Sequence, residues 1–207
     1  MARMDQCTRS SYEKISFDDL KQPLLIVIDM VNGFIKEGAL HDEAIMSIVP
    51  AITKMIPLVN ETIFIADTHQ ENAQEFVSYP KHCLVGTSEC ELIDEFKGFH
   101  KRVIKKNSTN TFHSKEWHSF MEKELINYHD IILCGCCSDI CVMQFALTLQ
   151  TYINEMNLQD ITLYVPVDMV ETYHIDGIHD AQYCNTYSLA NMAGNGIKVV
   201  SMISEDE

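Results

Sequence analysis

Short apolar runs rich in β-branched side chains alternate along the chain with longer segments whose apolar residues follow helical spacing. Runs of the first kind predict buried strands, and segments of the second kind predict helices that pack on a sheet. The runs predict strands at residues 24–29, 61–67, 102–105, 130–135, 160–167 and 197–202. The segments between them predict helices at 42–58, 88–96, 114–128, 139–156 and 176–193, with Asp42, Ser114 and Asp176 as N-caps.

This alternation is typical of an α/β protein with a parallel sheet. Strands that are apolar along their whole length are buried on both faces, so helices must cover both sides. We therefore predict a three-layer, doubly wound α/β fold with a mainly parallel six-stranded sheet. A chain of 207 residues suits one domain, which we place at 23–207, after a polar N-terminal extension at 1–22 that lies over the surface.

The composition narrows the choice of partners. The chain has 30 acidic and 15 basic side chains, a formal net charge of −15, which disfavours nucleic acid or an anionic membrane and fits a small ligand. The start lacks the apolar core of a secretion signal, and no later run is long and apolar enough to span a bilayer. We expect a cytoplasmic protein whose eight cysteines are free thiols.

The segment at 131–146 reads as a buried strand, a sharp turn and the first turns of a helix. Cys141 falls in the first helical turn, where Ser138 or Asp139 can act as N-cap and the free N–H groups favour a nucleophilic thiolate. The alternative is that the cysteines of this segment are small core side chains. Their C-x-C-C-x3-C spacing matches no usual structural zinc pattern.

Polar residues follow the ends of four predicted strands, where ligands bind in such sheets. They are Asp29 after the first strand, Asp67 and His69 after the second, Lys105 and Lys106 after the third, and Cys141 after the fourth. Any one of them could be a solvated loop start or a helix cap. Together they suggest a covalent thiol mechanism, in which a carboxylate exchanges protons and an ammonium stabilises the thiolate.

A metal site is a second candidate on the same rim. Asp67 and His69 form a D-x-H motif, His82 follows Asp67 by fifteen residues, and Glu75 precedes His82 by seven. Two imidazoles with one or two carboxylates suit zinc, manganese or iron. The same residue types are common in solvated loops, so a polar loop is the alternative interpretation.

Five segments, in this order, resemble the isochorismatase-like cysteine hydrolases and are most similar to the nicotinamidases. They are DMVNGF at 29–34, ADTH at 66–69, YPKHCLVGTSE at 79–89, KKNSTNTF at 105–112 and GCCSDICV at 135–142. The resemblance implies that Cys141 is the nucleophile, Asp29 the proton-transfer carboxylate and Lys106, or its neighbour Lys105, the third member of the triad. It also implies a cis peptide bond between Cys136 and Cys137, with the N–H groups of Cys137 and Cys141 forming an oxyanion hole.

The resemblance further implies a metal, zinc before manganese or iron, on Asp67, His69 and His82, with Glu75 as a fourth ligand seen in some members. In nicotinamidases this metal binds the pyridine nitrogen of the substrate. Phe34 matches a position that packs on the ring, and Tyr79 stands where tryptophan is common. The implied reaction is hydrolysis of nicotinamide to nicotinic acid and ammonia, a step of NAD salvage, and the implied assembly is a homo-oligomer.

Three departures weaken the substrate assignment more than the chemistry. Val31 replaces a usual glutamine, Gly33 a usual aspartate, and Lys81 the second proline of a P-P-H segment. A cysteine hydrolase of another small amide or carbamoyl compound therefore remains an alternative. A non-catalytic relative that binds a metabolite in the same cleft is another.

Overall fold

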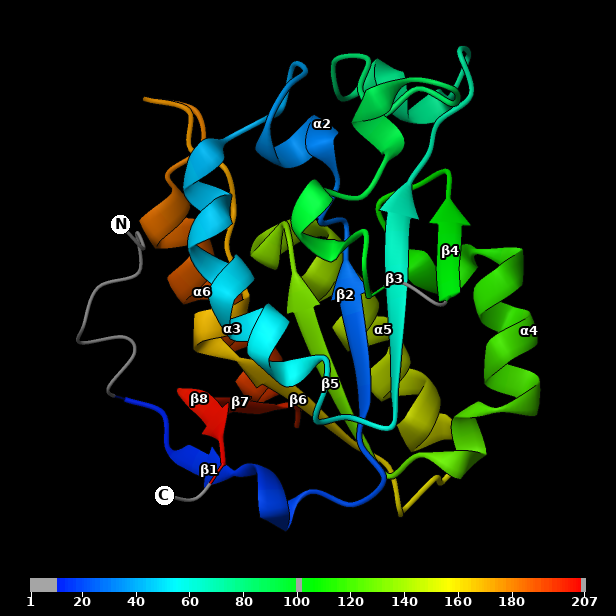
Figure 1. The fold of residues 1–207 in the computed structure, drawn as a ribbon, viewed down its shortest axis with the longest axis vertical. Helices are drawn as coiled ribbons and strands as arrows, with labels where there is room; N and C mark the ends of the chain where they lie inside the picture. The colour runs from blue at the N-terminus through cyan, green and yellow to red at the C-terminus, as the bar shows by residue number, and fades with distance from the viewer. Residues whose placement is uncertain (1–10, 100–101, 206–207) are drawn as a thin grey trace.

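Six parallel strands form the centre of the computed structural model, which describes residues 11–99 and 102–205 (Figure 1). The strands lie in the order β4-β3-β2-β5-β6-β7. This confirms the predicted α/β class and the parallel six-stranded sheet. Their bounds are β2 Leu24–Ile28, β3 Glu61–Asp67, β4 Arg102–Lys106, β5 Asp130–Gly135, β6 Thr162–Pro166 and β7 Lys198–Val200.

Helices cover both faces of the sheet because each central strand is apolar on both of its sides. Along β2, Leu25 and Val27 join one core, whereas Leu24 and Ile26 join the other. The first core includes side chains of α3, and the second includes side chains of α4, α5 and α6. Figure 1 shows α3 and α5 on opposite sides of the sheet. The α-helices are α2 Asn32–Ile35, α3 Val49–Met55, α4 Lys115–Lys123, α5 Met143–Glu155 and α6 Ala181–Gly194.

Short helical turns occupy much of the remaining chain. They are η1 Phe17–Asp19, η2 Glu43–Ile48, η3 Gln74–Val77, η4 Ser88–Cys90, η5 Asp94–Phe96, η6 Thr111–His113, η7 Leu125–Asn127, η8 Ser138–Val142 and η9 Val167–Met169. The predicted helix at 42–58 is therefore η2 followed by α3, and the predicted helix at 114–128 is α4 followed by η7. Asp42 and Ser114 cap these segments as expected. The last helix starts later than predicted, because Asp180 rather than Asp176 is its N-cap.

The predicted helix at 88–96 is wrong. This segment contains only the 3-10 turns η4 and η5, separated by an extended stretch. Leu92 pairs with Val31 in an antiparallel bridge, and the N–H of Ile93 donates to the carbonyl of Met30. Tertiary pairing with the chain that follows β2 therefore overrides the helical spacing of the apolar residues.

The predicted strand at 197–202 divides into two. β7 stays in the main sheet, and β8 (Met202–Ser204) pairs in parallel with β1 (Lys14–Ser16). The second half of the predicted N-terminal extension is thus tied to the end of the chain, whereas residues 1–10 lie outside the described residues. No helix in the described part of the chain is long and apolar enough to cross a membrane.

The strands β2 to β5 run in the same direction, so their carboxyl ends meet at one edge of the sheet. In Figure 1 this edge is at the top, beneath the loops that join β3 to β4. The neighbours β2 and β5 stand at the point where the strand order reverses, which is where α/β sheets leave a crevice. The polar residues identified from the sequence lie around this crevice.

Candidate active site

A buried lysine joins two aspartates and a cysteine at the carboxyl edge of the sheet. The ammonium Nζ of Lys106 lies 2.7 Å from Asp29 Oδ2 and 2.9 Å from Asp67 Oδ1. It also lies 3.8 Å from the sulfur of Cys141. All four side chains are almost fully buried. The structure therefore brings together the three residues predicted as a catalytic triad and adds Asp67 as a second carboxylate on the lysine.

The alternation of β4 decides which of the two adjacent lysines enters this group. Successive side chains of a strand point to opposite faces. Lys106 points into the site and is 3% exposed, whereas Lys105 is exposed to solvent. The structure therefore places Lys106, and not Lys105, beside Asp29 and Cys141.

Asp29 and Gly135 owe their positions to unusual backbone conformations at the ends of β2 and β5. Asp29 has φ +52°, a left-handed conformation that aspartate tolerates better than most residues. Gly135 has φ +110°, and a Cβ there would lie 2.0 Å from the carbonyl oxygen of Ile28. Only glycine fits this close approach of the two strands. The chain can therefore turn sharply after β5 and carry Cys141 back over the sheet.

The turn that carries Cys141 differs in detail from the predicted helix start. The peptide bond between Cys136 and Cys137 is cis, as the resemblance implied, and η8 is a single turn of π-helix. Among the described residues, no side chain caps this turn. The predicted caps are engaged elsewhere, because Ser138 donates to Asn185 and Asp139 contacts His179. The backbone carbonyl of Cys137 closes the turn by accepting from the N–H groups of Ile140 and Val142.

The expectation of a lowered thiol pKa at Cys141 is also wrong. Burial raises the pKa of this thiol well above its usual value, and the carboxylates of Asp29 and Asp67 raise it further, against the lowering effect of Lys106. Burial likewise raises the pKa of Asp29 to about 6, again opposed by Lys106. The direction of this shift favours the protonated thiol, and the adjacent Asp29 can act as the base that removes its proton.

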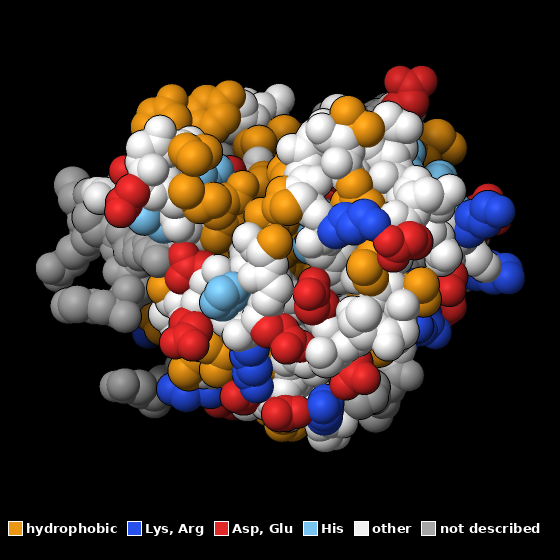
Figure 2. Space-filling view, turned by 90° about the horizontal axis from the view of Figure 1, so that it is seen from above, with side chains coloured by type: hydrophobic (Ala, Val, Ile, Leu, Met, Phe, Trp, Pro, Cys, Tyr) orange, Lys and Arg blue, Asp and Glu red, His pale blue; other side chains and the backbone are white. Residues whose placement is uncertain are grey.

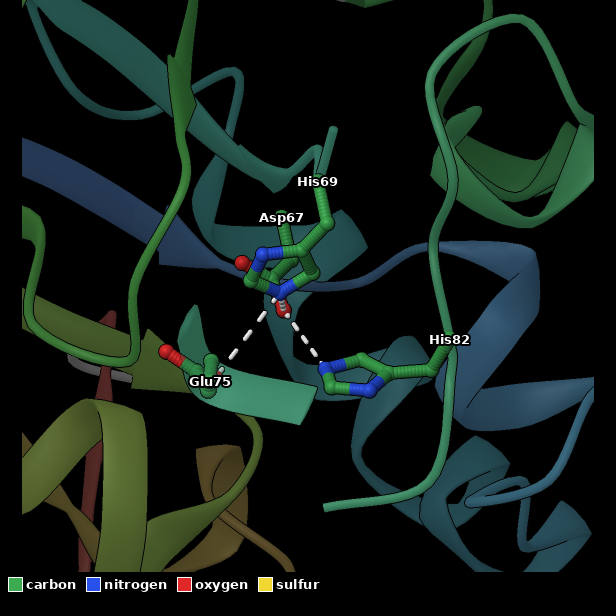
Figure 3. A group of neighbouring side chains, drawn as sticks. All are labelled: Asp67, His69, Glu75 and His82. Carbon is green, nitrogen blue, oxygen red and sulfur yellow. Dashed lines mark hydrogen bonds and ion pairs between the residues drawn. The ribbon is translucent and has the colours of Figure 1, made fainter. Parts of the chain in front are cut away.

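Asp67 also belongs to another cluster, in which four potential metal ligands converge (Figure 3). They are Asp67, His69, Glu75 and His82, whose ligand atoms lie within 4.8 Å of one another. Asp67 Oδ2 lies 2.9 Å from His69 Nε2 and 3.2 Å from His82 Nε2. Glu75 Oε1 lies 3.7 Å from His69 Nε2. Asp67 thus touches Lys106 with one oxygen and both histidines with the other.

The hydrogen bonds around these four residues fit a metal cation. Asn107 Oδ1 accepts from the N–H of Gln70, so it is also the acceptor for His69 Nδ1, 3.2 Å away. His82 Nδ1 lies 2.7 Å from the carbonyl oxygen of Pro80, which can only accept. Both rings therefore donate through Nδ1 and, when neutral, present Nε2 lone pairs to carboxylate oxygens, which calls for a cation between them.

Glu75 adds an unused acceptor to this cluster. Its Oε2 accepts from the backbone N–H of Thr109, whereas its Oε1 is buried and has no hydrogen-bond partner among the described residues. Burial opposes ionisation of Asp67, but the ammonium of Lys106 keeps the pKa of Asp67 well below its usual range. The donor set of two imidazoles and two carboxylates suits zinc, manganese or iron.

A small pocket joins the thiol to the candidate metal ligands. Cys141 and Cys137 line it together with Asp67, Glu75 and His82. Figure 2 looks onto this end of the molecule, where hydrophobic side chains gather in the centre and upper left, and acidic and basic side chains lie interspersed in the lower part. The other residues that line the pocket are Phe34, Leu40, Tyr79, Thr109, Ile140 and Tyr173.

Aromatic rings surround one of the candidate ligands. The ring of Phe34 lies 5.5 Å from that of His82, and the ring of Tyr79 lies 6.3 Å from it. Both predicted aromatic residues therefore face the pocket. Two pocket residues could not be predicted from the sequence. Tyr173 lies beyond the carboxyl end of β6, and Leu40 lies in a loop whose sequence gives no signal that it folds over the site.

The three departures from the nicotinamidase pattern lie outside the set of described residues that line this pocket. Val31 is buried in the bridge to Leu92, and Lys81 pairs with Glu71 at the surface. A Cβ on Gly33 would lie 2.7 Å from the sulfur of Cys83. The glycine therefore reflects the close packing of the loop before β4, and none of the three departures changes a residue that lines the pocket among the described residues.

Comparison with known proteins identifies the family and supports the fold. The isochorismatase domain matches residues 23–203. Nicotinamidase 1 of Arabidopsis thaliana is 25% identical over 212 residues, with 87% of this chain and 86% of that protein covered. The zinc complex of Pyrococcus horikoshii pyrazinamidase is 22% identical with a TM-score of 0.68, covering 87% of this chain and 99% of that one. N-carbamoylsarcosine amidase of Thermoplasma acidophilum is 22% identical with a TM-score of 0.65, covering 90% of this chain and 98% of that one.

The fold and the extent of the family match define the class of protein. The chain belongs to the isochorismatase domain family, and it is similar to nicotinamidase 1 of Arabidopsis thaliana. The two solved structures support the fold alone. The substrate must be argued from the site.

Proposed function

We propose that this protein is a metal-assisted cysteine amidohydrolase that converts nicotinamide to nicotinic acid and ammonia. The observation that carries the proposal is the shared pocket, in which Cys141 lies beside three of the candidate metal ligands. A flat pyridine amide needs one group to hold its ring nitrogen and another to attack its amide carbon, and a pocket with both groups supplies that orientation.

In the proposed reaction, Asp29 takes the proton of the Cys141 thiol as the sulfur attacks the amide carbon. The resulting tetrahedral intermediate places its oxyanion near the backbone N–H groups of Cys137 and Cys141. Asp29 then gives the proton to the leaving nitrogen, so that ammonia departs and a thioester remains. Water attacks the thioester with Asp29 as base, which releases the carboxylic acid and restores the thiol.

Lys106 is the positive charge that pairs with the carboxylates of Asp29 and Asp67. Burial opposes its charge, but Asp29 and Asp67 raise the pKa of Lys106 well above its usual value, so it stays an ammonium. It therefore orients Asp29 and stabilises negative charge on the sulfur during proton transfer. A divalent cation held by Asp67, His69 and His82, with Glu75 as the candidate fourth ligand, would supply a coordination position for the ring nitrogen.

The test is a screen of ammonia release over nicotinamide, pyrazinamide, ureidoacrylate and N-carbamoyl compounds, with and without a chelator. We expect nicotinamide to turn over, the chelator to slow it, and elemental analysis to find a divalent metal. If nicotinamide is inert while metal is bound and a non-pyridine amide or carbamoyl compound turns over, the substrate assignment is wrong and only the cysteine hydrolase survives.

A non-catalytic metabolite-binding relative is the competing class. Measuring how fast an alkylating agent reacts with Cys141 at different pH values would distinguish an enzyme from a binding protein only if the resting thiol were ionised. Burial raises the pKa of Cys141 instead, so slow alkylation is expected in either case. A better discriminator is turnover itself. A binding protein would retain nicotinamide unchanged, whereas the amidohydrolase would release ammonia, and Cys141→Ala would stop that release without unfolding the protein.

A further inference from the structure

A second group of metal-ligating side chains lies behind the pocket wall, outside the site described above. It consists of Asp139, His179 and Cys184, whose ligand atoms all lie within 4.8 Å of one another. They come from three different parts of the chain: the η8 turn, the loop after β6 and the first turns of α6. The side chains of Asp139 and His179 are only 13% and 14% exposed.

The hydrogen bonds of His179 fix which of its nitrogens faces this group. His179 Nδ1 lies 2.8 Å from the backbone carbonyl oxygen of Tyr173, which can only accept. The ring therefore donates through Nδ1, and its Nε2 lies 2.8 Å from Asp139 Oδ2. If the ring is neutral, a lone pair on Nε2 faces a carboxylate oxygen, and the two repel each other. The short contact is then stable only with a cation between the two atoms or with a proton on Nε2.

Two further observations favour a metal over a proton. Asp139 Oδ1 is buried and has no hydrogen-bond partner among the described residues. A proton on Nε2 would satisfy only Oδ2 of Asp139, whereas a metal can bind the carboxylate, the imidazole and the neighbouring Cys184 sulfur together. The same arrangement, with Nδ1 donated to a carbonyl and Nε2 against a carboxylate 3.2 Å away, occurs at His82 in the first cluster.

We propose that Asp139, His179 and Cys184 form a second binding site for a divalent metal of zinc type. One thiolate, one imidazole and one carboxylate are typical of a zinc site with three protein ligands and a fourth position open to water. Ligands about 2.0–2.3 Å from a tetrahedral ion lie roughly 3.3–3.8 Å apart, so small shifts of these side chains suffice. The soft sulfur selects against magnesium and calcium.

This metal would join the turn that carries Cys141 to the part of the pocket lining that contains Tyr173. Asp139 is two residues before Cys141, and His179 stacks on Tyr173 with ring centroids 4.1 Å apart. Tyr173 lines the pocket. The second metal therefore has a structural role, since it fixes the two walls relative to each other without touching the reacting atoms.

The test uses cobalt(II) as a probe, because a cobalt–thiolate bond gives a charge-transfer absorption in the near ultraviolet that nitrogen and oxygen ligands do not give. The full chain carries Cys141→Ala, so that the nucleophile cannot contribute sulfur. We expect about two cobalt ions per chain and a thiolate band. Adding Cys184→Ser should abolish the band and reduce binding to about one ion, whereas adding Cys90→Ser, at a cysteine of η4, should change neither.

His179→Gln in the same background gives an independent measure, with circular dichroism to show that each variant is folded. It should weaken the thiolate band at limiting cobalt by about tenfold or more. A thiolate band that never appears, or that survives Cys184→Ser, overturns the proposal. Because the first cluster contains no sulfur, the band reports the second site even if the first binds no metal and the proposed function fails.

Discussion

Asp29 should set the acid limb of the pH dependence of catalysis. Burial raises the pKa of Asp29 from 3.8 to about 6, against the lowering effect of Lys106. The ionised form is the base that takes the thiol proton, so activity is present above about pH 6 and is lost as the pH falls through this value. A group with that pKa is about 90% ionised at pH 7 and about 10% at pH 5, so kcat/KM should fall about tenfold between them.

The measurement is ammonia release by the intact protein at low substrate concentration from pH 4.5 to 8, with bound metal determined at each pH. Asp29→Asn should lower kcat about 10²–10⁴-fold. It should change the free energy of unfolding little, because Asp67 still lies 2.9 Å from Lys106 Nζ and pairs with its charge. The exposed Asp94→Asn is the matched control. A profile that is flat between pH 5 and 7 while metal stays bound would refute the role of Asp29.

The remaining predictions concern the charges, the metal and the packing of the site. Lys106→Met leaves two buried carboxylates facing each other and should lower the free energy of unfolding by about 3–5 kcal/mol in chemical denaturation, whereas Lys105→Met, on the exposed side of β4, should change it by less than about 0.5 kcal/mol. His69→Ala should remove metal from the first cluster, measured by elemental analysis, and slow ammonia release; unchanged activity would show that this metal is not used. Gly33→Asp should cost about 1–3 kcal/mol because its Cβ would lie 2.7 Å from the Cys83 sulfur, and an unchanged melting temperature would contradict this packing.

The strands of the main sheet could be predicted because each is an uninterrupted apolar run, which only a two-sided burial explains. The bounds predicted for the strands at 61–67 and 130–135 agree with β3 and β5. The segment at 88–96 could not be predicted in the same way. Its apolar spacing fits a helix, and only the bridge to Val31, far away in the sequence, makes it extended.

The site shows the same division between local and distant information. The order of strands places Asp29, Lys106 and Cys141 on one rim, so their proximity follows from the fold class. The pKa of Cys141 could not be predicted from its local helix turn, because burial and two carboxylates from other strands raise it. Likewise, Asp139 looked like a cap because its partner His179 lies 40 residues further along the chain.

The most direct test of the central claim is to find the covalent intermediate. The protein is mixed with nicotinamide, quenched in acid within the first turnovers and digested, and the peptides are analysed by mass spectrometry. We predict an acyl adduct on the peptide at Cys141, present in a Cys184→Ser variant and absent in Cys141→Ala, which should also release no ammonia. Ammonia release that continues in Cys141→Ala would contradict the proposed mechanism.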